Sequence, residues 1–154
     1  MSLDRARAHL ERFGLADRIR LFDVSSATVE LAAQAVGCEP ARIAKTLSFQ
    51  LPDSPVLILA AGDARIDNAK YKATFHAKAK MLAFDDVETL IGHGVGGVCP
   101  FGINEGIPVW LDESLRRFDI VYPAAGTANS VVELNLAELE LASQAQGWID
   151  VCKI

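Results

Sequence analysis

The sequence predicts a protein of the α+β class that forms a single domain over residues 1–154. Apolar residues recur three and four positions apart in the first part of the chain, which is the spacing of amphipathic helices. Runs of β-branched and aromatic residues, which are typical of strands, fill the second half. Because 51% of the 154 residues are apolar and 23% are charged, the composition is that of an ordinary globular domain with one core.

The first part of the chain predicts two helices and one short helical turn. Ser2 suits the start of the first helix, and Gly14 suits the position after its end. The segment TVELAAQAVG predicts a second helix, with Thr28 as its N-cap and Gly37 at its end. Pro40 predicts a helical turn, because proline is favoured at a first helical position. The apolar residues that indicate the first helix are Leu3, Ala6, Leu10 and Phe13.

The middle of the chain predicts a pair of strands followed by two helices. The segments KTLSFQL and PVLILAAG predict the strands, with a turn at residues 52–54 between them. Asp67 is expected to cap a helix that runs through a lysine-rich segment. A further short helix is expected to begin at Asp85 or Asp86 and to end at Gly92.

The second half of the chain predicts several strands and one more helix. The segments IPVWLD, DIVYPAAG and SVVELNL are rich in β-branched and aromatic residues and predict strands. Asn135 followed by Glu138 has the pattern of a capping box, which predicts a helix through Ala145. The segment WIDVCKI predicts a closing strand. No internal repeat, linker or low-complexity segment interrupts this pattern.

Composition and charge argue against several classes of protein. A formal net charge of −5 argues against tight non-specific binding to nucleic acid. Cys38, Cys99 and Cys152 lie far apart, so they indicate neither a disulfide framework nor a zinc site. The N-terminus is charged and amphipathic, unlike a secretory signal, and no apolar run is long enough to span a bilayer. We therefore expect a cytoplasmic protein without membrane contact, metal or cofactor.

The segment RIDNAKYKATFHAKAK, residues 65–80, is locally basic although the protein is acidic. Asp67 is its only acidic residue. One interpretation is a solvated helix face, and the other is a patch that contacts phosphate groups of a ligand. Net charge does not separate the two, because a small patch acts over a short range. The basic residues of the segment are Arg65, Lys70, Lys72, Lys78 and Lys80.

Lys45 lies where a helical turn runs into an apolar strand, in the segment RIAKTLSF. Its neighbours are core-forming residues, and lysine is rarely buried without a partner. The side chain could extend from the strand end to solvent. Alternatively, its ammonium is fixed at the mouth of a pocket, where it holds a carbonyl or phosphate oxygen.

Four glycines fall within the segment GVGGVCPFG, residues 94–102. Gly96, Gly97 and Pro100 could shape a tight loop whose N–H groups converge on a developing oxyanion. A strained turn between sheet segments is the alternative. The segment is neither a P-loop nor a dinucleotide-binding fingerprint, because the residues that these motifs require do not follow.

Two further features have both a functional and a purely structural interpretation. Gly126 follows two alanines in PAAGTANS, which indicates either a turn or the wall of a small pocket. His93 and Cys99 could form a thiol–imidazole pair, but no third residue is evident to orient them. A lone cysteine beside proline and phenylalanine is also typical of a core.

These signals, in this order, resemble the YbaK/ProX family of aminoacyl-tRNA editing domains. The resemblance rests on the lysine of AKTLSF, a strand ending in AAGD, then DNAKYK, GVGGVCPFG and PAAG. It extends from the helix at Thr28 to the strand near Leu134. The family includes free-standing deacylases and the insertion domain of bacterial prolyl-tRNA synthetases. The resemblance therefore implies a curved mixed β-sheet, partly closed into a barrel and flanked by helices.

The resemblance also implies an activity. Members of the family hydrolyse an amino acid wrongly attached to tRNA, typically alanine or cysteine on the tRNA for proline. It implies tRNA as the partner, with an aminoacyl-tRNA synthetase as a candidate second partner, and leaves the oligomeric state open. The alternative is a non-catalytic RNA- or nucleotide-binding module that kept the pocket and lost the chemistry.

The family's functional residues fall on specific positions of this sequence. The family lysine falls on Lys45, and the family loop Gly-x-x-x-Pro falls on residues 96–100. The bare backbone at Gly97 is expected to approach the ester and to limit the size of the aminoacyl side chain. No Ser/His/Asp triad is visible, so water is the expected nucleophile, helped by the free hydroxyl of the terminal ribose. The expected catalytic residues are Lys45, Gly96, Gly97 and Pro100.

One position departs from the cysteine-specific branch of the family. That branch has Ser-Ala-Gly where this chain has Ala124, Ala125 and Gly126, so a hydroxyl is missing. Alanine, serine or threonine therefore becomes as good a candidate for the edited amino acid as cysteine. The residues expected to bind substrate are Thr28, Lys70, Lys72, Val98, Cys99, Phe101, Ala124, Ala125 and Gly126.

Overall fold

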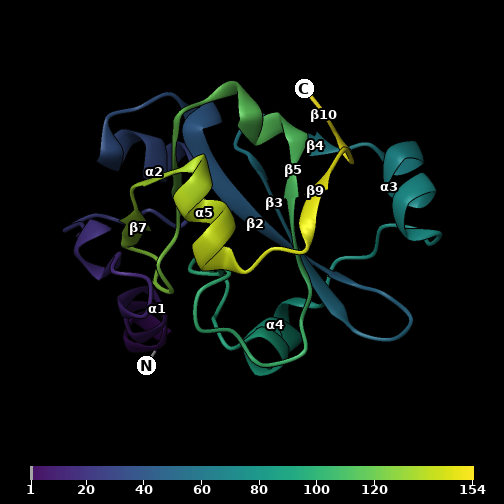
Figure 1. The fold of residues 1–154 in the computed structure, drawn as a ribbon, viewed down its shortest axis with the longest axis horizontal. Coiled ribbons are helices and arrows are strands. Elements are labelled where there is room, and N and C mark those ends of the chain that lie inside the picture. The colour runs from purple at the N-terminus through teal and green to yellow at the C-terminus, as the bar shows by residue number, and fades with distance from the viewer. Residues whose placement is uncertain (1) are drawn as a thin grey trace.

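The computed structural model describes residues 2–154 and contains a central six-stranded mixed sheet (Figure 1). The strand order is β8-β6-β2-β3-β5-β9, and the sheet curls into a half-barrel. The predicted α+β class and the curved mixed sheet are therefore confirmed. The strands of this sheet are β2 (Ile43–Gln50), β3 (Pro55–Ala61), β5 (Val109–Asp112), β6 (Ile120–Pro123), β8 (Leu134–Asn135) and β9 (Gly147–Ile149).

The sheet combines antiparallel and parallel pairs of strands. The two longest strands, β2 and β3, are antiparallel, with Ala44 opposite Ala61 and Gln50 opposite Pro55. Strand β6 pairs with β2 in parallel, and β5 and β9 extend the other side in parallel. Two small antiparallel sheets flank this one: β1 (Ile19–Leu21) pairs with β7 (Ser130–Val132), and β4 (Arg65–Ile66) pairs with β10 (Cys152–Lys153).

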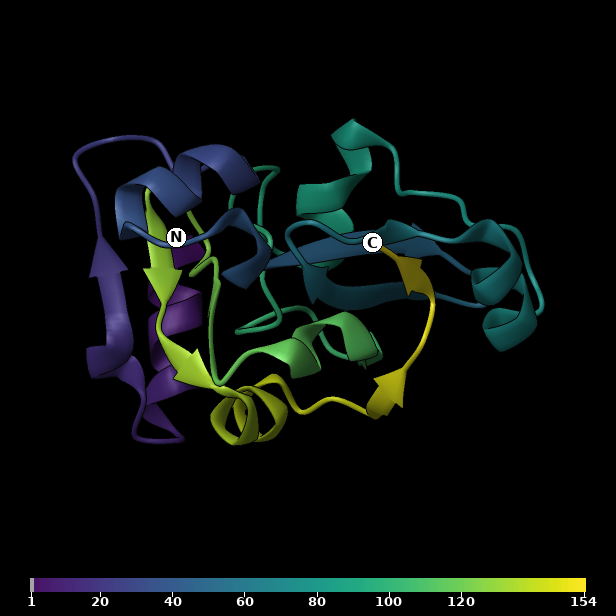
Figure 2. The same cartoon turned by 90° about the horizontal axis from the view of Figure 1, so that it is seen from above.

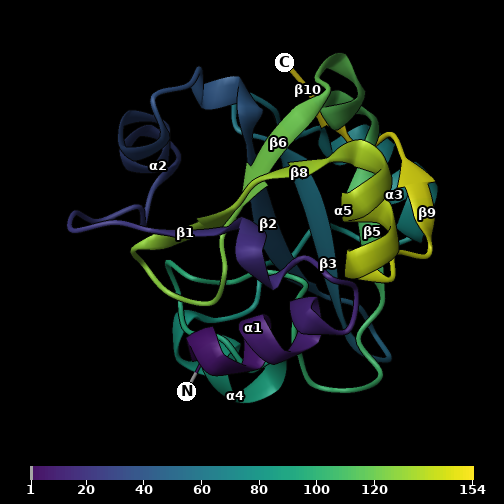
Figure 3. The same ribbon diagram turned by 60° about the vertical axis from the view of Figure 1, so that its left-hand side comes forward.

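Among residues 2–154, five α-helices surround the sheet, with α1 and β1 at one end of the molecule and α3 at the other (Figure 2). The C-terminal end of α4 approaches α1 (Figure 3), where the Arg5 guanidinium donates a hydrogen bond to the Gly92 carbonyl. Within residues 2–154, no helix is both long and apolar enough to cross a membrane. The helices are α1 (Ser2–Glu11), α2 (Val29–Val36), α3 (Asn68–Phe75), α4 (Phe84–Ile91) and α5 (Leu136–Ser143), with 3₁₀ helices at Ala16–Arg18, Pro40–Arg42 and Glu113–Arg117.

The capping residues predicted from the sequence mark the starts of two helices correctly. The Thr28 hydroxyl accepts the Leu31 N–H at the start of α2, as predicted. Asn135 and Glu138 form both hydrogen bonds of the predicted capping box at the start of α5. The start of α4 differs from the prediction, because the helix begins at Phe84 without a side-chain cap.

The C-terminal segment departs from the single strand that was predicted. Strand β9 ends at Ile149, and the separate strand β10 follows after two residues. The Val151 N–H donates to the buried carboxylate of Asp112, at 2.9 Å, which draws the chain out of the central sheet. Strands β1 and β4 were not predicted, since each is only two or three residues long.

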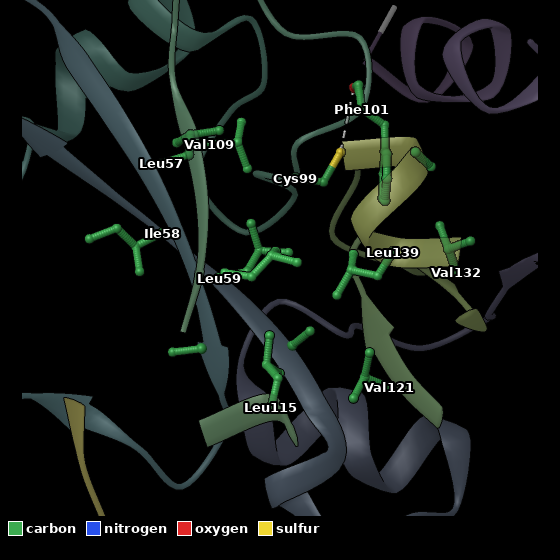
Figure 4. Close-up of a cluster of buried hydrophobic side chains, with 14 of the residues drawn as sticks. Leu57, Ile58, Leu59, Cys99, Phe101, Val109, Leu115, Val121, Val132 and Leu139 are labelled. Atoms are coloured by element: carbon green, nitrogen blue, oxygen red, sulfur yellow. Dashed lines mark hydrogen bonds between the residues drawn. The ribbon is translucent and has the colours of Figure 1, made fainter. Parts of the chain in front are cut away.

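The main hydrophobic core lies between the sheet and α5 (Figure 4). Leu57 and Leu59 of β3 point toward Leu139 of α5, whereas Ile58 points to the opposite side of the sheet. Phe101 reaches the same core and is fully buried. The glycine-rich segment is therefore anchored in the core at its C-terminal end.

Candidate active site

A cavity of about 330 Å³ lies beside β2. Its walls come from the outer edge of β2, the start of α2, the segment that leads into α4, the glycine-rich loop and strands β6 and β7. Five of the residues predicted from the sequence line it together, although they come from distant parts of the chain. These are Thr28, Lys45, Gly96, Val98 and Ala124.

The cavity exists because the outer edge of β2 is paired at both ends and open in the middle. Strand β6 pairs only with Ile43 and Ala44. At the other end, the Ser48 carbonyl accepts the Leu82 N–H at 3.1 Å. Because alternate residues of an antiparallel strand direct both backbone groups to the same side, the Thr46 N–H and C=O also point away from β3. The floor of the cavity therefore presents unpaired backbone groups.

Two buried hydroxyls add to this polar floor. Within residues 2–154, Ser26 Oγ and Thr46 Oγ1 have no hydrogen-bond partner, and both residues line the cavity. A buried polar group without a partner costs about 1–3 kcal/mol, so a ligand with polar groups is favoured here. Neither residue stands out in the sequence, because isolated serines and threonines are common everywhere in proteins.

The Lys45 ammonium is fixed in place by the loop after β3. Nζ donates to the carbonyl oxygens of Ala64 and, at 3.4 Å, of Gly62. Burial lowers the pKa of Lys45, while the nearby Cys152 and Asp63 act in the opposite direction. The side chain is half-buried and lines the cavity, so it does not simply extend into solvent.

The loop that holds Lys45 is itself held on two sides. The Asp63 carboxylate accepts two hydrogen bonds from the Arg117 guanidinium, at 3.0 and 2.5 Å. A Cβ at Gly62 would overlap the Pro40 carbonyl oxygen and lie 2.7 Å from Val29. Glycine therefore allows the end of β3 to meet the start of α2 closely, and the charged pair fixes the loop there.

The two glycine motifs found in the sequence contact each other. A Cβ at Gly97 would lie 2.5 Å from backbone atoms of both Gly126 and Thr127. The Gly97 N–H donates to the Gly94 carbonyl at 3.1 Å. Gly97 therefore serves a close approach of two backbone segments, and the structure does not bring it to the cavity wall as expected. Its N–H is also occupied and does not face an oxyanion.

Other N–H groups of the loop remain open. Gly96 has a φ of +95°, which favours glycine, and its missing side chain faces Ala27 and Ala128. Within residues 2–154, the N–H groups of Gly96 and Val98 have no acceptor. Both residues line the cavity, as does Val95, so the N–H groups of this loop are candidate donors for an oxyanion.

Several predicted residues lie outside the cavity. Cys99, Phe101 and Ala125 are fully buried in the core. Pro100 is part of a second hollow beside α1, and Gly126 packs against the Ser2 carbonyl. The structure therefore does not bring these residues into contact with a ligand in the cavity, although they support its walls from behind.

The structure argues against the thiol–imidazole pair. Complete burial raises the pKa of the Cys99 thiol to about 12, so the reactive thiolate is disfavoured. His93 Nε2 donates to the Phe101 carbonyl at 2.6 Å, and the Cys99 thiol contacts the same oxygen at 3.6 Å. Residues 2–154 contain no group of three metal-ligating side chains that could hold an ion.

Lys70 and Lys72 of α3 also lie away from the cavity. The Lys70 ammonium pairs with Asp150 at 3.0 Å and donates to the Cys152 carbonyl at 2.9 Å. The hydrogen bond to Asp150 raises the pKa of Lys70. Lys70 therefore ties α3 to the C-terminal segment, whereas Lys72 is exposed.

Comparison with known proteins agrees with this geometry. Residues 23–141 match the family described as "Aminoacyl-tRNA editing domain". The chain is 48% identical over 154 residues to the uncharacterized protein YwhH of Bacillus subtilis, covering 99% of this chain and 98% of that protein. The solved structure of "a putative trans-editing enzyme for prolyl tRNA synthetase" superposes with a TM-score of 0.89 at 30% identity, covering 99% of this chain and 98% of that one.

The chain belongs to the aminoacyl-tRNA editing domain family, which confirms the resemblance found in the sequence. Proline–tRNA ligases are more distant relatives. The ligase of Bacillus cytotoxicus is 27% identical over 113 residues, which make up 73% of this chain and 19% of the ligase. This chain thus corresponds to a small part of the ligase. Together, the family and its solved relative support an aminoacyl-tRNA deacylase activity.

The contact between the glycine motifs predicts a large effect on stability. Gly97→Ala should lower the free energy of unfolding by about 2 kcal/mol or more, because the methyl group would overlap the Gly126 and Thr127 backbone. Gly94→Ala is the matched control: its Cβ would find the nearest atom, of Glu88, at 3.5 Å, so the change should stay within about 1 kcal/mol. Urea unfolding measures both, and equal losses would contradict the assigned contact.

The loop after β3 predicts the direction of a pKa change at Lys45. Asp63→Asn should lower the pKa of Lys45 further, because the Asp63 charge favours the protonated ammonium. The loss of that charge also leaves Arg117 unpaired beside the loop. The side-chain carbon resonances of Lys45, followed by NMR against pH, report the value. Asp53→Asn, in the exposed hairpin turn, should leave it unchanged. An unchanged or raised pKa in Asp63→Asn would remove Asp63 from this role.

Proposed function

We propose that this protein is an editing hydrolase that removes a wrongly attached small amino acid from tRNA. One observation carries the proposal. The cavity is lined by Lys45, by two loop residues with open N–H groups, Gly96 and Val98, and by two residues with unpaired hydroxyls, Ser26 and Thr46. This set suits hydrolysis of an aminoacyl ester, which needs donors for the oxyanion and polar groups that orient the ester.

The proposed reaction uses water as the nucleophile. Among residues 2–154, no cysteine or histidine lines the cavity, and the serine and threonine hydroxyls there have no base beside them. Water attacks the carbonyl carbon of the ester, and the oxyanion that forms accepts hydrogen bonds from the Gly96 and Val98 N–H groups. The bond between that carbon and the ribose oxygen then breaks. The ribose oxygen takes up a proton, and a free amino acid and a free tRNA are released.

The remaining polar groups suit an aminoacyl group. Its α-ammonium needs hydrogen-bond acceptors, and the Thr46 carbonyl with the hydroxyls of Ser26 and Thr46 can supply them. Lys45 uses two of its three N–H donors on the loop, which leaves one for the substrate carbonyl or a phosphate oxygen.

The lining of the cavity bears on which amino acid is edited. It combines small residues, such as Ala27 and Gly96, with larger ones, such as Tyr122, and Ala124 supplies no hydroxyl that would favour cysteine. We propose alanine, serine, threonine or cysteine as the edited amino acid. The prolyl-tRNA ligases among the relatives, together with the solved trans-editing relative, support tRNA for proline or a similar tRNA as the carrier.

A panel of mischarged tRNAs tests this proposal. The wild-type protein should deacylate at least one tRNA that carries a small amino acid. Lys45→Ala should lower its single-turnover rate by roughly 30-fold, the equivalent of a charge-assisted contact of about 2 kcal/mol. Lys72→Ala, on the exposed face of α3, is the control and should stay near the wild-type rate. Wild-type protein that binds tRNA but deacylates none of the panel would instead indicate a non-catalytic binding module.

The basic segment predicts how binding depends on salt. Within residues 2–154, Lys78 and Lys80 form no ion pair, and they precede Met81 at the cavity rim. The double variant Lys78→Ala, Lys80→Ala should raise KM for tRNA and flatten its dependence on salt, because fewer counterions are released. Lys70→Ala should change the salt dependence less, since Lys70 is already paired with Asp150. Equal salt slopes for the wild type and the double variant would make the segment a merely solvated surface.

A further inference from the structure

Three large apolar side chains are exposed at the mouth of the cavity. Met81, Phe84 and Val95 are 58%, 73% and 53% exposed, and all three line the cavity. We call them the apolar rim. The other exposed large apolar residues of the protein, such as Leu90 and Leu141, do not line it. Exposed apolar surface that gathers at one opening marks a surface that binds a ligand or a partner.

The apolar rim continues the hydrophobic core, because buried residues of α4 pack directly behind it. Phe84, Val87 and Ile91 share one face of α4 at helical spacing. Val87 and Ile91 are buried, whereas Phe84 extends the same face beyond the core and over the cavity. Met81 is anchored because its backbone pairs with Phe49 on the edge of β2. The flat ring of Phe84 therefore stands at the first turn of a helix that is anchored in the core.

The charges around the rim distinguish its ligand from a phosphate group. Asp85 and Asp86, in the first turn of α4, directly follow Phe84 and are exposed. Carboxylates disfavour a phosphodiester at this point. On the other side, Lys78 and Lys80 precede Met81. The rim therefore suits an uncharged flat group, with anionic groups accommodated toward the lysines.

We propose that the apolar rim is a stacking site for the terminal adenine base of the aminoacylated tRNA, with Phe84 as the platform. This inference rests on the proposed function. In an aminoacyl-tRNA the ester is carried by the ribose of the terminal adenosine, so the adenine base adjoins it and is the nearest flat apolar surface. An ester held in the cavity places that base at its mouth. Stacking on an aromatic side chain recognises any base, so the site adds affinity for the tRNA end rather than sequence specificity.

A stable analogue tests the stacking site without depending on turnover. The probe is 3′-alanylamino-3′-deoxyadenosine, in which an amide replaces the ester, and the comparison probe is the same aminoacyl sugar without its base. Calorimetry gives Kd for each. Phe84→Ala should bind the adenosine probe roughly tenfold more weakly. Its Kd for the base-free probe should equal that of the wild type. Phe84→Trp should retain the affinity for the adenosine probe, and Leu90→Ala on the same helix should match the wild type.

Each other outcome would overturn the stacking site. An unchanged Kd in Phe84→Ala, an equal loss for both probes, or no binding by the wild type would do so. So would a wild-type dimer in sedimentation that Phe84→Ala dissociates, because the rim would then be an interface between copies. The mischarged tRNA panel keeps the two proposals apart. A wild-type protein that deacylates tRNA retains the proposed function even if the Phe84 result is negative.

Discussion

The site depends on a stretch of strand edge that no neighbouring strand pairs. Strand β6 pairs with β2 only at Ile43 and Ala44, and the paired register ends with Pro123 opposite Ala44. Beyond this point the chain leaves the sheet and forms the PAAG turn. The middle of β2 is then open, and the Thr46 backbone groups face a cavity rather than a partner strand. An unpaired strand edge can pair with a ligand as well as with another strand, and here loops surround it.

A second constraint, the contact between two glycine motifs, sets the shape of that cavity. The chain that leaves β6 reaches the glycine-rich loop at Gly126, where it meets Gly97 backbone to backbone. No side chain larger than hydrogen fits between them, which accounts for Gly97 and Gly126, whereas a Cβ at Gly94 would find room. The neighbouring residues Val95, Gly96 and Val98 line the cavity. The glycine-rich loop thus packs against the Gly126 segment on one face and lines the cavity on the other.

The sequence predicted interactions between residues close together in the chain, but not interactions between residues far apart in it. The caps at Thr28 and Asn135 were predicted correctly, because each hydrogen bond joins residues three positions apart. The partner of Lys70 was not predicted, because Asp150 is 80 residues away. The same holds for Gly97, whose contact with Gly126 depends on the tertiary fold. Composition marked both glycine segments as unusual, but only the structure shows which glycine packs and which lines the cavity. Strands β1 and β4 were missed because they are too short to show a pattern.

The environment of Lys45 limits the part that this residue can take in the proposed reaction. The carbonyl oxygens of Gly62 and Ala64 can only accept hydrogen bonds, so Nζ is the donor to both. Burial lowers the pKa of Lys45, while nearby groups, Cys152 and Asp63 among them, favour the ammonium form. Because two donors are directed at the loop, the ammonium has a fixed position and little freedom to move a proton. Lys45 is thus suited to orient an oxygen of the substrate and to balance negative charge. Activation of the attacking water is left to another group, and within the proposed reaction the free hydroxyl of the terminal ribose is the one that adjoins the ester.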